Sequence, residues 1–293
     1  MKGIYFGIGC DNPDACLENY LEDAVITIWT KKHPLLAFFG LAYALSWVVE
    51  IPLALRAQGV IQADIPFALH YLAAYGPMLS ALIVTGLTGG SRGLRELLGR
   101  MTKWKLSPGW WLVAVAPLGL YLLVAIALWL IQRKPIDLVT MGQVDFLPAL
   151  GMAAMPVWIL TFGIGEETGW RGFALPRLQE GRSALHATII LWAFWALWHL
   201  PLFFYSYEVS VLPGFLIGLL AGAIVFTWLY DSTCGSILMV ALWHGTFNFT
   251  TACVTCKTSL NAAVISTLVM VWAVVVVLHF KPTSLSRSSE QVI

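Results

Sequence analysis

The sequence predicts an all-α protein: a polytopic membrane helix bundle of about eight transmembrane helices, with both termini in the cytosol. Of the 293 residues, 59% are hydrophobic and only 11% are charged, whereas a soluble domain carries about 25% charged residues. The chain also contains 14 Trp residues, which suit a multi-span protein because indole rings anchor at the lipid headgroups. Most of the chain is therefore expected to lie in lipid.

The predicted spans are apolar windows of about 20 residues, the length that crosses the hydrocarbon core as a helix. They are Leu35–Leu55, Phe67–Leu87, Trp110–Ile131, Phe146–Gly165, Leu185–Phe204, Leu212–Tyr230, Ser236–Thr255 and Leu260–Phe280. The chain then consists of a cytosolic N-terminal segment, a single membrane domain and a cytosolic tail, at 1–34, 35–280 and 281–293.

The basic residues predict the orientation, because cytosolic loops carry an excess of Lys and Arg. With the N-terminus in the cytosol, few of the 17 Lys and Arg residues fall on the outer side: Arg56, Arg133, Lys134 and Lys257. This orientation places the stretch 165–167 at the cytosolic end of the fourth span. A net charge of +1 and the lack of any basic tract longer than Lys31-Lys32 argue against nucleic acid as a partner.

Some polar and sulfur-containing residues are expected to be structural. Four ionisable side chains lie near predicted span ends, where they can reach an interface: Glu50, His70, His186 and His279. Five cysteines cannot form a complete set of internal disulfides. The spacing of Cys253 and Cys256 is typical of a redox or metal site, but no His or second cysteine pair lies nearby. We therefore interpret both as small apolar packing residues.

The first candidate motif is Glu166-Glu167-Thr-Gly-Trp-Arg171, at the end of the fourth span. On a continuous helix Glu167 and Arg171 are i,i+4 neighbours and can pair, which leaves Glu166 free for use as a general base. The alternative is an interfacial salt-bridge cluster. The same segment carries a stripe of small residues that allows another helix to approach closely: Gly165, Gly169 and Gly172.

The second candidate is His199, in the fifth span, one turn after Trp195 on the same helix face. A histidine in lipid needs a hydrogen-bond partner, and Pro201 frees the carbonyl of Leu197 for this role. The pattern fits either a catalytic imidazole or a histidine that is satisfied inside the core.

The third candidate is the i,i+4 pair His244 and Asn248 in the seventh span. The two side chains point to one place and can stabilise a developing oxyanion, or they can join two helices as polar contacts. Together with Glu166 and His199, they supply the groups needed for attack of water on a carbonyl carbon.

In this order, the motifs resemble the CAAX-processing and bacteriocin-processing family (CPBP, also called ABI) of glutamic intramembrane endopeptidases, which includes the Ras-converting enzymes. The family patterns E-E-x-x-x-R and H-x-x-x-N are intact, at residues 166–171 and 244–248. The pattern F-x-x-x-H departs, because Trp195 stands at the Phe position. The resemblance covers about Phe146 to Asn248 and implies a catalytic core at about 146–255 in a prokaryotic-type member.

The resemblance implies a role for each motif residue. Glu166 would act as general base on a water, His199 would hold and polarise this water, and His244 with Asn248 would stabilise the oxyanion. The supporting residues would be Glu167 and Arg171, which position the base, and Trp195, whose ring packs over His199.

We therefore expect an intramembrane endopeptidase of the cell membrane, with its active site in a cavity near the cytosolic leaflet. The expected partners are the lipid bilayer and a lipid-anchored or amphipathic protein substrate, such as a prenylated CAAX-type protein. The family mechanism uses no cofactor, but the same His and Glu residues can bind zinc. A zinc-dependent protease and a non-catalytic scaffold or immunity protein of the same fold are the two alternatives.

Overall fold

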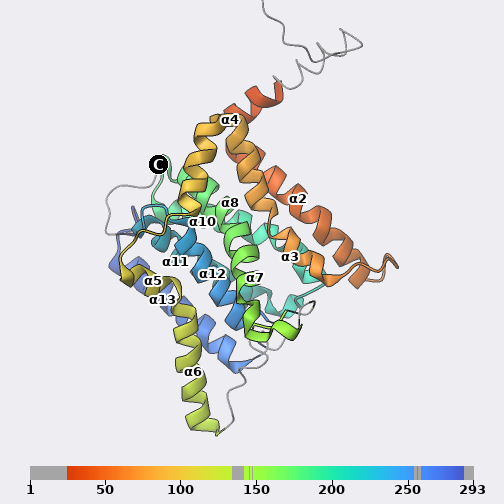
Figure 1. The fold of residues 1–293 in the computed structure, drawn as a ribbon, viewed down its shortest axis with the longest axis vertical. Helices are drawn as coiled ribbons and strands as arrows, with labels where there is room; N and C mark the ends of the chain where they lie inside the picture. Colours follow the sequence, from red (N-terminus) through yellow and green to blue (C-terminus); the bar gives the residue numbers. More distant parts are fainter. Residues whose placement is uncertain are drawn as a thin grey trace, which may run out of the picture.

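The computed structural model describes residues 25–133, 142–144, 146, 148–253, 256 and 259–286. Within these ranges the chain is helical and contains no strand, as the sequence predicts (Figure 1). The elements are α2 (Pro34–Ala57), η1 (Phe67–Leu69), α3 (His70–Ala73), α4 (Gly76–Met101), α5 (Pro108–Ala114), α6 (Ala116–Gln132), η2 (Pro148–Ala154), α7 (Met155–Trp158), η3 (Ile159–Glu166), α8 (Glu167–Gly169), η4 (Trp170–Ala174), α9 (Leu175–Gln179), α10 (Ala184–Trp198), η5 (Leu200–Phe204), η6 (Val209–Val211), α11 (Leu212–Ser232), α12 (Ile237–Thr251) and α13 (Leu260–His279).

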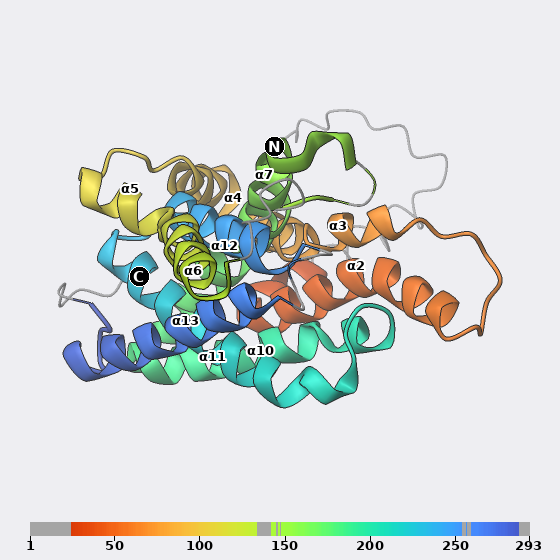
Figure 2. The same cartoon turned by 90° about the horizontal axis from the view of Figure 1, so that it is seen from below.

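The helices pack in pairs around α12 and the irregular segment that runs from η3 to η4. Helix α2 packs along α4, α11 packs along α13, and α10 packs against α11 (Figure 2). Helix α12 packs against η3 and also contacts α6, α7 and α8. The motif-bearing segments thus lie at the centre of the bundle.

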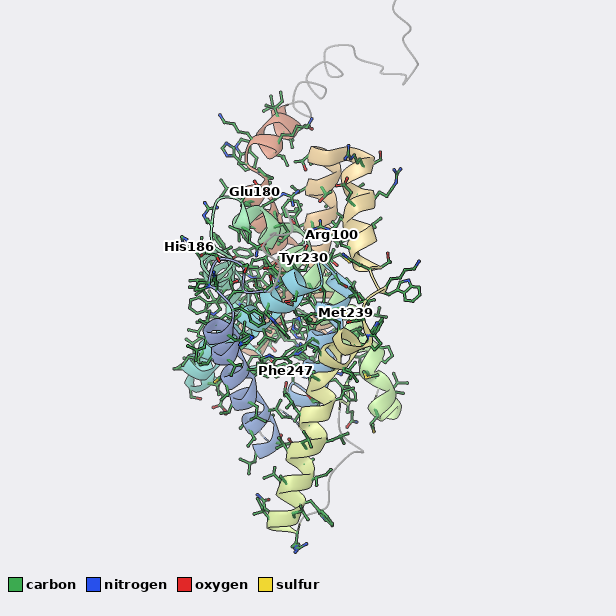
Figure 3. The ribbon with its side chains drawn as sticks, turned by 90° about the vertical axis from the view of Figure 1, so that its left-hand side faces the viewer. Arg100, Glu180, His186, Tyr230, Met239 and Phe247 are labelled. Atoms are coloured by element: carbon green, nitrogen blue, oxygen red, sulfur yellow. A yellow bond between two sulfur atoms is a disulfide. The ribbon has the colours of Figure 1, made fainter. Side chains whose placement is uncertain are left out.

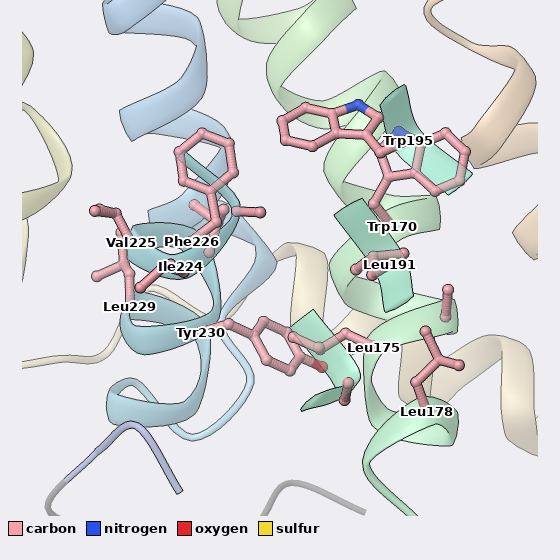
Figure 4. Packing of buried hydrophobic residues seen from close by; sticks show 14 of the residues in the cluster. Trp170, Leu175, Leu178, Leu191, Trp195, Ile224, Val225, Phe226, Leu229 and Tyr230 are labelled. Carbon is pink, nitrogen blue, oxygen red and sulfur yellow. The ribbon is translucent and has the colours of Figure 1, made fainter. Parts of the chain in front are cut away.

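A large cluster of buried apolar side chains holds this arrangement together. It joins the η4–α9 segment to α10 and α11, as Trp170, Trp195 and Phe226 illustrate (Figure 4). Aromatic rings dominate the contacts: Phe39 of α2 stacks on Phe194 of α10 at a centroid distance of 4.0 Å. In lipid, such close packing replaces the hydrophobic driving force that acts in water.

The predicted span count is matched only in part. By length and composition, five of the described helices or helix pairs are able to cross a membrane, and the pair α5–α6, bent by 58°, makes a sixth. The predicted fourth and seventh spans are not among them. The fourth is divided into short helical pieces, and α12 has only 15 residues, about 22 Å of helix, against a hydrocarbon core of about 30 Å. The count of about eight spans therefore stays a prediction, as does the position of the termini, which lie outside the described residues.

The fifth predicted span, Leu185–Phe204, matches the membrane-length segment Ala184–Phe204, but its helix changes from α to 3-10 winding near the end. Helix α10 stops at Trp198, and residues 200–204 form the 3-10 helix η5. Pro201 accounts for this, because proline has no backbone donor and the residue before it avoids helical backbone angles.

The glycine stripe does allow close helix packing, as predicted. A Cβ atom on Gly169 would lie 2.5 Å from Cβ of Pro77, and one on Gly165 would lie 2.7 Å from the carbonyl oxygen of Ala74. Both positions therefore require glycine where this segment meets α3 and the start of α4. The same holds where α12 meets η3, since a Cβ on Gly245 would lie 2.5 Å from Cα of Ile159.

Polar side chains join α4, α9 and α11 at one end of the bundle. The Arg100 guanidinium donates to the Tyr230 hydroxyl at 2.7 Å, and the two residues lie side by side in Figure 3. The Gln179 amide donates to the buried Asp231 carboxylate at 2.8 Å. This is the end that the positive charges assign to the cytosol.

The interpretation of Cys253 and Cys256 as packing residues alone is wrong. Both are buried, but they are joined by a disulfide with a Cα–Cα distance of 4.9 Å. The bridge follows the C-terminus of α12, which the predicted orientation places on the outer side. Disulfides persist in oxidising compartments, so the predicted orientation, which stays a prediction, would place the bridge where it is stable.

Candidate active site

Glu167 connects two of the predicted motifs. Its carboxylate accepts a hydrogen bond from Arg171 Nη1 at 3.1 Å, so the predicted i,i+4 ion pair is present. The same carboxylate lies 2.8 Å from Nδ1 of His244. Both Glu167 and Arg171 are completely buried. His244 was expected to act beside Asn248, and its contact with Glu167 was not predicted.

The guanidinium of Arg171 lies between two aromatic rings. Its Cζ is 4.4 Å from the ring centroid of Trp195 and 4.7 Å from that of Phe226. Nε and Nη2 of Arg171 have no hydrogen-bond partner in the described parts of the chain. The π faces therefore supply the electrostatic contact for this side of the cation.

Glu166 is 2% exposed and is the last residue of the π-helix η3. Its Oε2 accepts a hydrogen bond from the indole Nε1 of Trp195 at 2.8 Å. The wider π-helical turn changes the angle between successive side chains, so that Glu166 faces α10 whereas Glu167 faces α12. The two adjacent carboxylates thus have different partners, as the sequence led us to expect.

His199 directly follows the last residue of α10 and is 8% exposed. Its Nδ1 lies 2.7 Å from the carbonyl oxygen of Trp195, not from that of Leu197, so the predicted acceptor was wrong. A carbonyl oxygen only accepts, and Nδ1 therefore carries the proton. In the neutral imidazole, Nε2 is then a free acceptor.

Asn248 lies one turn after His244 on α12, as its spacing requires, and its side chain is half-buried. No hydrogen bond of its side chain to the other motif residues is present in the described ranges. Helix α12 therefore brings Asn248 near the cluster, while direct side-chain contacts join Glu166, Glu167, Arg171, Trp195, His199 and His244.

A second buried polar cluster was missed by the sequence interpretation. Glu50 was expected to reach an interface, but it is fully buried and accepts a hydrogen bond from Tyr205 at 3.2 Å. The Tyr205 hydroxyl in turn lies 2.8 Å from Nδ1 of His70. Burial raises the pKa of the Tyr205 hydroxyl, and the neighbouring Glu50 carboxylate raises it further. The hydroxyl therefore keeps its proton at neutral pH and can donate it. These residues lie far apart in sequence, so no local pattern connects them.

The Glu50 cluster is close to the candidate site. Glu50 and Glu166 are near enough to interact electrostatically. His186 and His279 are exposed, in agreement with the interfacial role expected of them.

The described residues contain no group of three or more His, Cys, Asp or Glu side chains placed to hold a metal ion. The acidic and imidazole groups of the site instead pair with Trp195, Arg171 and one another.

Comparison with known proteins finds a family similar to the segment that carries this site. The family model described as type II CAAX prenyl endopeptidase Rce1-like matches residues 148–250, from the start of η2 to α12, and so includes every predicted site residue. Over these residues the chain is similar to the Rce1-like family. The CAAX prenyl protease 2 of Methanococcus maripaludis is 35% identical to it over 113 residues.

That alignment covers 36% of this chain and 40% of the relative, so less than half of either protein is aligned. The Rce1-like match leaves out α2 to α6, and with them Glu50 and His70.

Proposed function

We propose that this chain is an intramembrane endopeptidase that hydrolyses a peptide bond with a water activated by Glu166 and His199. The observation that carries the proposal is the contact network at the centre of the bundle. Trp195 holds Glu166 through its side chain and His199 through its carbonyl, while Glu167 holds His244. The network lies inside the segment matched by the family.

The hydrogen-bonding states of Glu166 and His199 suit them to hold a water. Oε2 of Glu166 is occupied by the indole N–H, which leaves Oε1 as an acceptor. Nε2 of His199 is also an acceptor, since Nδ1 donates to the Trp195 carbonyl. A water that donates one hydrogen to each acceptor directs its oxygen lone pair at the carbonyl carbon. Glu166 then takes the proton as the C–O bond forms, and returns it to the leaving amine.

The side chains of α12 are suited to the developing negative charge. Nδ1 of His244 faces Glu167, so Nε2 is the nitrogen left to face the substrate. For Nε2 to donate to an oxyanion, both ring nitrogens must carry a proton, because Nδ1–H then donates to the Glu167 carboxylate. Asn248 supplies an amide donor one turn further along. Such donors, fixed before reaction, are suited to stabilise a tetrahedral intermediate.

The substrate we propose is a lipid-anchored or amphipathic protein in the cell membrane, cut near the cytosolic leaflet. A membrane-anchored chain partitions into the same layer as the site and so reaches it by lateral diffusion. For a prenylated CAAX-type substrate, cleavage after the modified cysteine releases a C-terminal tripeptide.

The test uses the purified full-length chain in detergent with a fluorogenic prenylated peptide and its unprenylated counterpart. We expect wild-type protein to cleave the prenylated peptide preferentially. Glu166→Gln keeps an oxygen for the Trp195 donor but removes the base, and should lower kcat by about 10²- to 10⁴-fold. His199→Ala should lower kcat to a similar extent. Full activity of Glu166→Gln would contradict the proposal.

A chelator arm separates the zinc alternative. We propose a metal-free site, so activity should survive chelation. Loss of activity that zinc alone restores would instead support a zinc protease built from the same residues. Absence of cleavage by wild-type protein across both peptides, with a cellular phenotype that survives Glu166→Gln, would support a scaffold.

A further inference from the structure

Trp195 contacts four of the other residues of the candidate site. Its indole N–H donates to Glu166, its carbonyl accepts from His199, and its ring face covers the Arg171 guanidinium at 4.4 Å. Its ring also lies edge-on to the His244 ring, with 5.8 Å between the centroids. This residue therefore links α10 directly to Glu166 and to Arg171, which in turn pairs with Glu167.

The indole N–H of Trp195 is the group that the phenylalanine of the family pattern does not have. Phenylalanine, which stands at this position in F-x-x-x-H, offers a ring of similar shape for packing but no hydrogen-bond donor. The replacement therefore adds one specific interaction, the N–H donation to Glu166 Oε2.

Packing alone does not explain why this donor faces a carboxylate. Other buried indoles in the bundle leave Nε1 without a partner among the described residues: Trp170, Trp198, Trp228 and Trp243. The fold thus tolerates an unpaired buried indole N–H at several positions, whereas the N–H of Trp195 lies 2.8 Å from the proposed base.

We propose that the indole N–H of Trp195 is a positioning donor that fixes Oε2 of Glu166 and so assigns Oε1 to accept the proton of the attacking water. The inference rests on the proposed function of Glu166. Since Trp195 also holds Nδ1 of His199 through its carbonyl, one residue sets both acceptors that face the water. Without the donor, the carboxylate rotates freely and the base is misplaced for part of the time.

The test compares two replacements of Trp195 with a matched control. Trp195→Phe restores the family residue and removes the donor. Replacement of Trp195 by β-(3-benzothienyl)alanine keeps the bicyclic shape and exchanges the N–H for sulfur. Trp228→Phe removes a buried indole whose N–H has no partner and which packs against Trp110 and Trp272, away from the site.

We expect both Trp195 variants to lower kcat by about 10- to 100-fold with KM nearly unchanged, because the lost contact acts on the base and not on the substrate. Trp228→Phe should keep the wild-type kcat. The benzothienyl variant decides the outcome if Trp195→Phe folds poorly, as judged by its elution in size-exclusion chromatography and its thermal unfolding.

A wild-type kcat in the benzothienyl variant would overturn the inference, as would a rise in KM alone. Failure of the underlying function is a distinct outcome, since Glu166→Gln would then be active. An inactive Glu166→Gln beside a fully active benzothienyl variant would refute only the role of the indole donor.

Discussion

Arg171 is a buried cation whose cost is offset by several partners. It pairs with Glu167 and lies against the rings of Trp195 and Phe226, with no exposed surface. Breaking a buried pair by removing one partner is strongly destabilising, because the other charge is then left uncompensated in a medium of low dielectric. The first consequence of losing Arg171 is therefore structural.

We predict that Arg171→Met lowers the free energy of unfolding by about 3–5 kcal/mol, measured by denaturant unfolding in detergent micelles. Adding Glu167→Gln should restore part of this loss, since no lone charge then remains. Lys105→Met is the matched control: it also removes a cation beside a ring, Trp104, but an exposed one, and should change stability by less than about 0.5 kcal/mol. Equal effects of Arg171→Met and Lys105→Met would contradict this account.

At the scale of elements, the site depends on how closely α12 approaches η3. Irregular backbone inside a membrane protein is tolerated where it is buried in protein, and residues 165–176 of the irregular segment are all buried. Gly245 lets the backbones meet, and His244 beside it reaches Glu167 only because they do.

We predict that Gly245→Ala destabilises the protein by about 1–3 kcal/mol, since its Cβ would lie 2.5 Å from Cα of Ile159 and the two elements must separate. Peptidase activity should fall as well, because the His244–Glu167 contact lengthens. The control is Gly222→Ala on α11, where a new Cβ meets nothing within 4 Å. It should be neutral or stabilising, by up to about 1 kcal/mol. Unchanged activity and stability in Gly245→Ala would argue against tight packing here.

At the scale of the whole molecule, two sets of cysteines allow the predicted orientation to be tested. Cys234 is exposed and free, and follows α11 at the end assigned to the cytosol. The Cys253–Cys256 disulfide follows α12 at the opposite end of the adjoining helix. The predicted orientation would place the free thiol in a reducing compartment and the disulfide in an oxidising one.

We predict that a membrane-impermeant maleimide labels Cys234 only after the cells are permeabilised, in a variant whose other four cysteines are replaced by serine. In a variant that keeps only Cys253 and Cys256, an impermeant reductant added outside intact cells should make both reactive. Labelling of Cys234 from outside would reverse the proposed topology and place the Arg100–Tyr230 end on the outer face.

The local chemistry of the motifs was predictable from the sequence. The Glu167–Arg171 pair and the shared helix of His244 and Asn248 follow from the i,i+4 spacing, which a helix fixes within one turn. The irregular pieces of the fourth segment were not predictable, because apolar composition alone does not distinguish α, 3-10 and π winding.

The sequence by itself determined the all-helical class and the inventory of acid, imidazole and amide groups, because composition and short spacings act locally. Only the tertiary structure decided which of these groups contact one another. Trp195 reaches Glu166 across 29 residues, His244 reaches Glu167 across 77, and Tyr205 reaches Glu50 across 155. Contacts at such separations depend on which helices pack together. Helix packing depends in turn on glycines that let backbones approach closely and on aromatic rings that pack along the whole bundle.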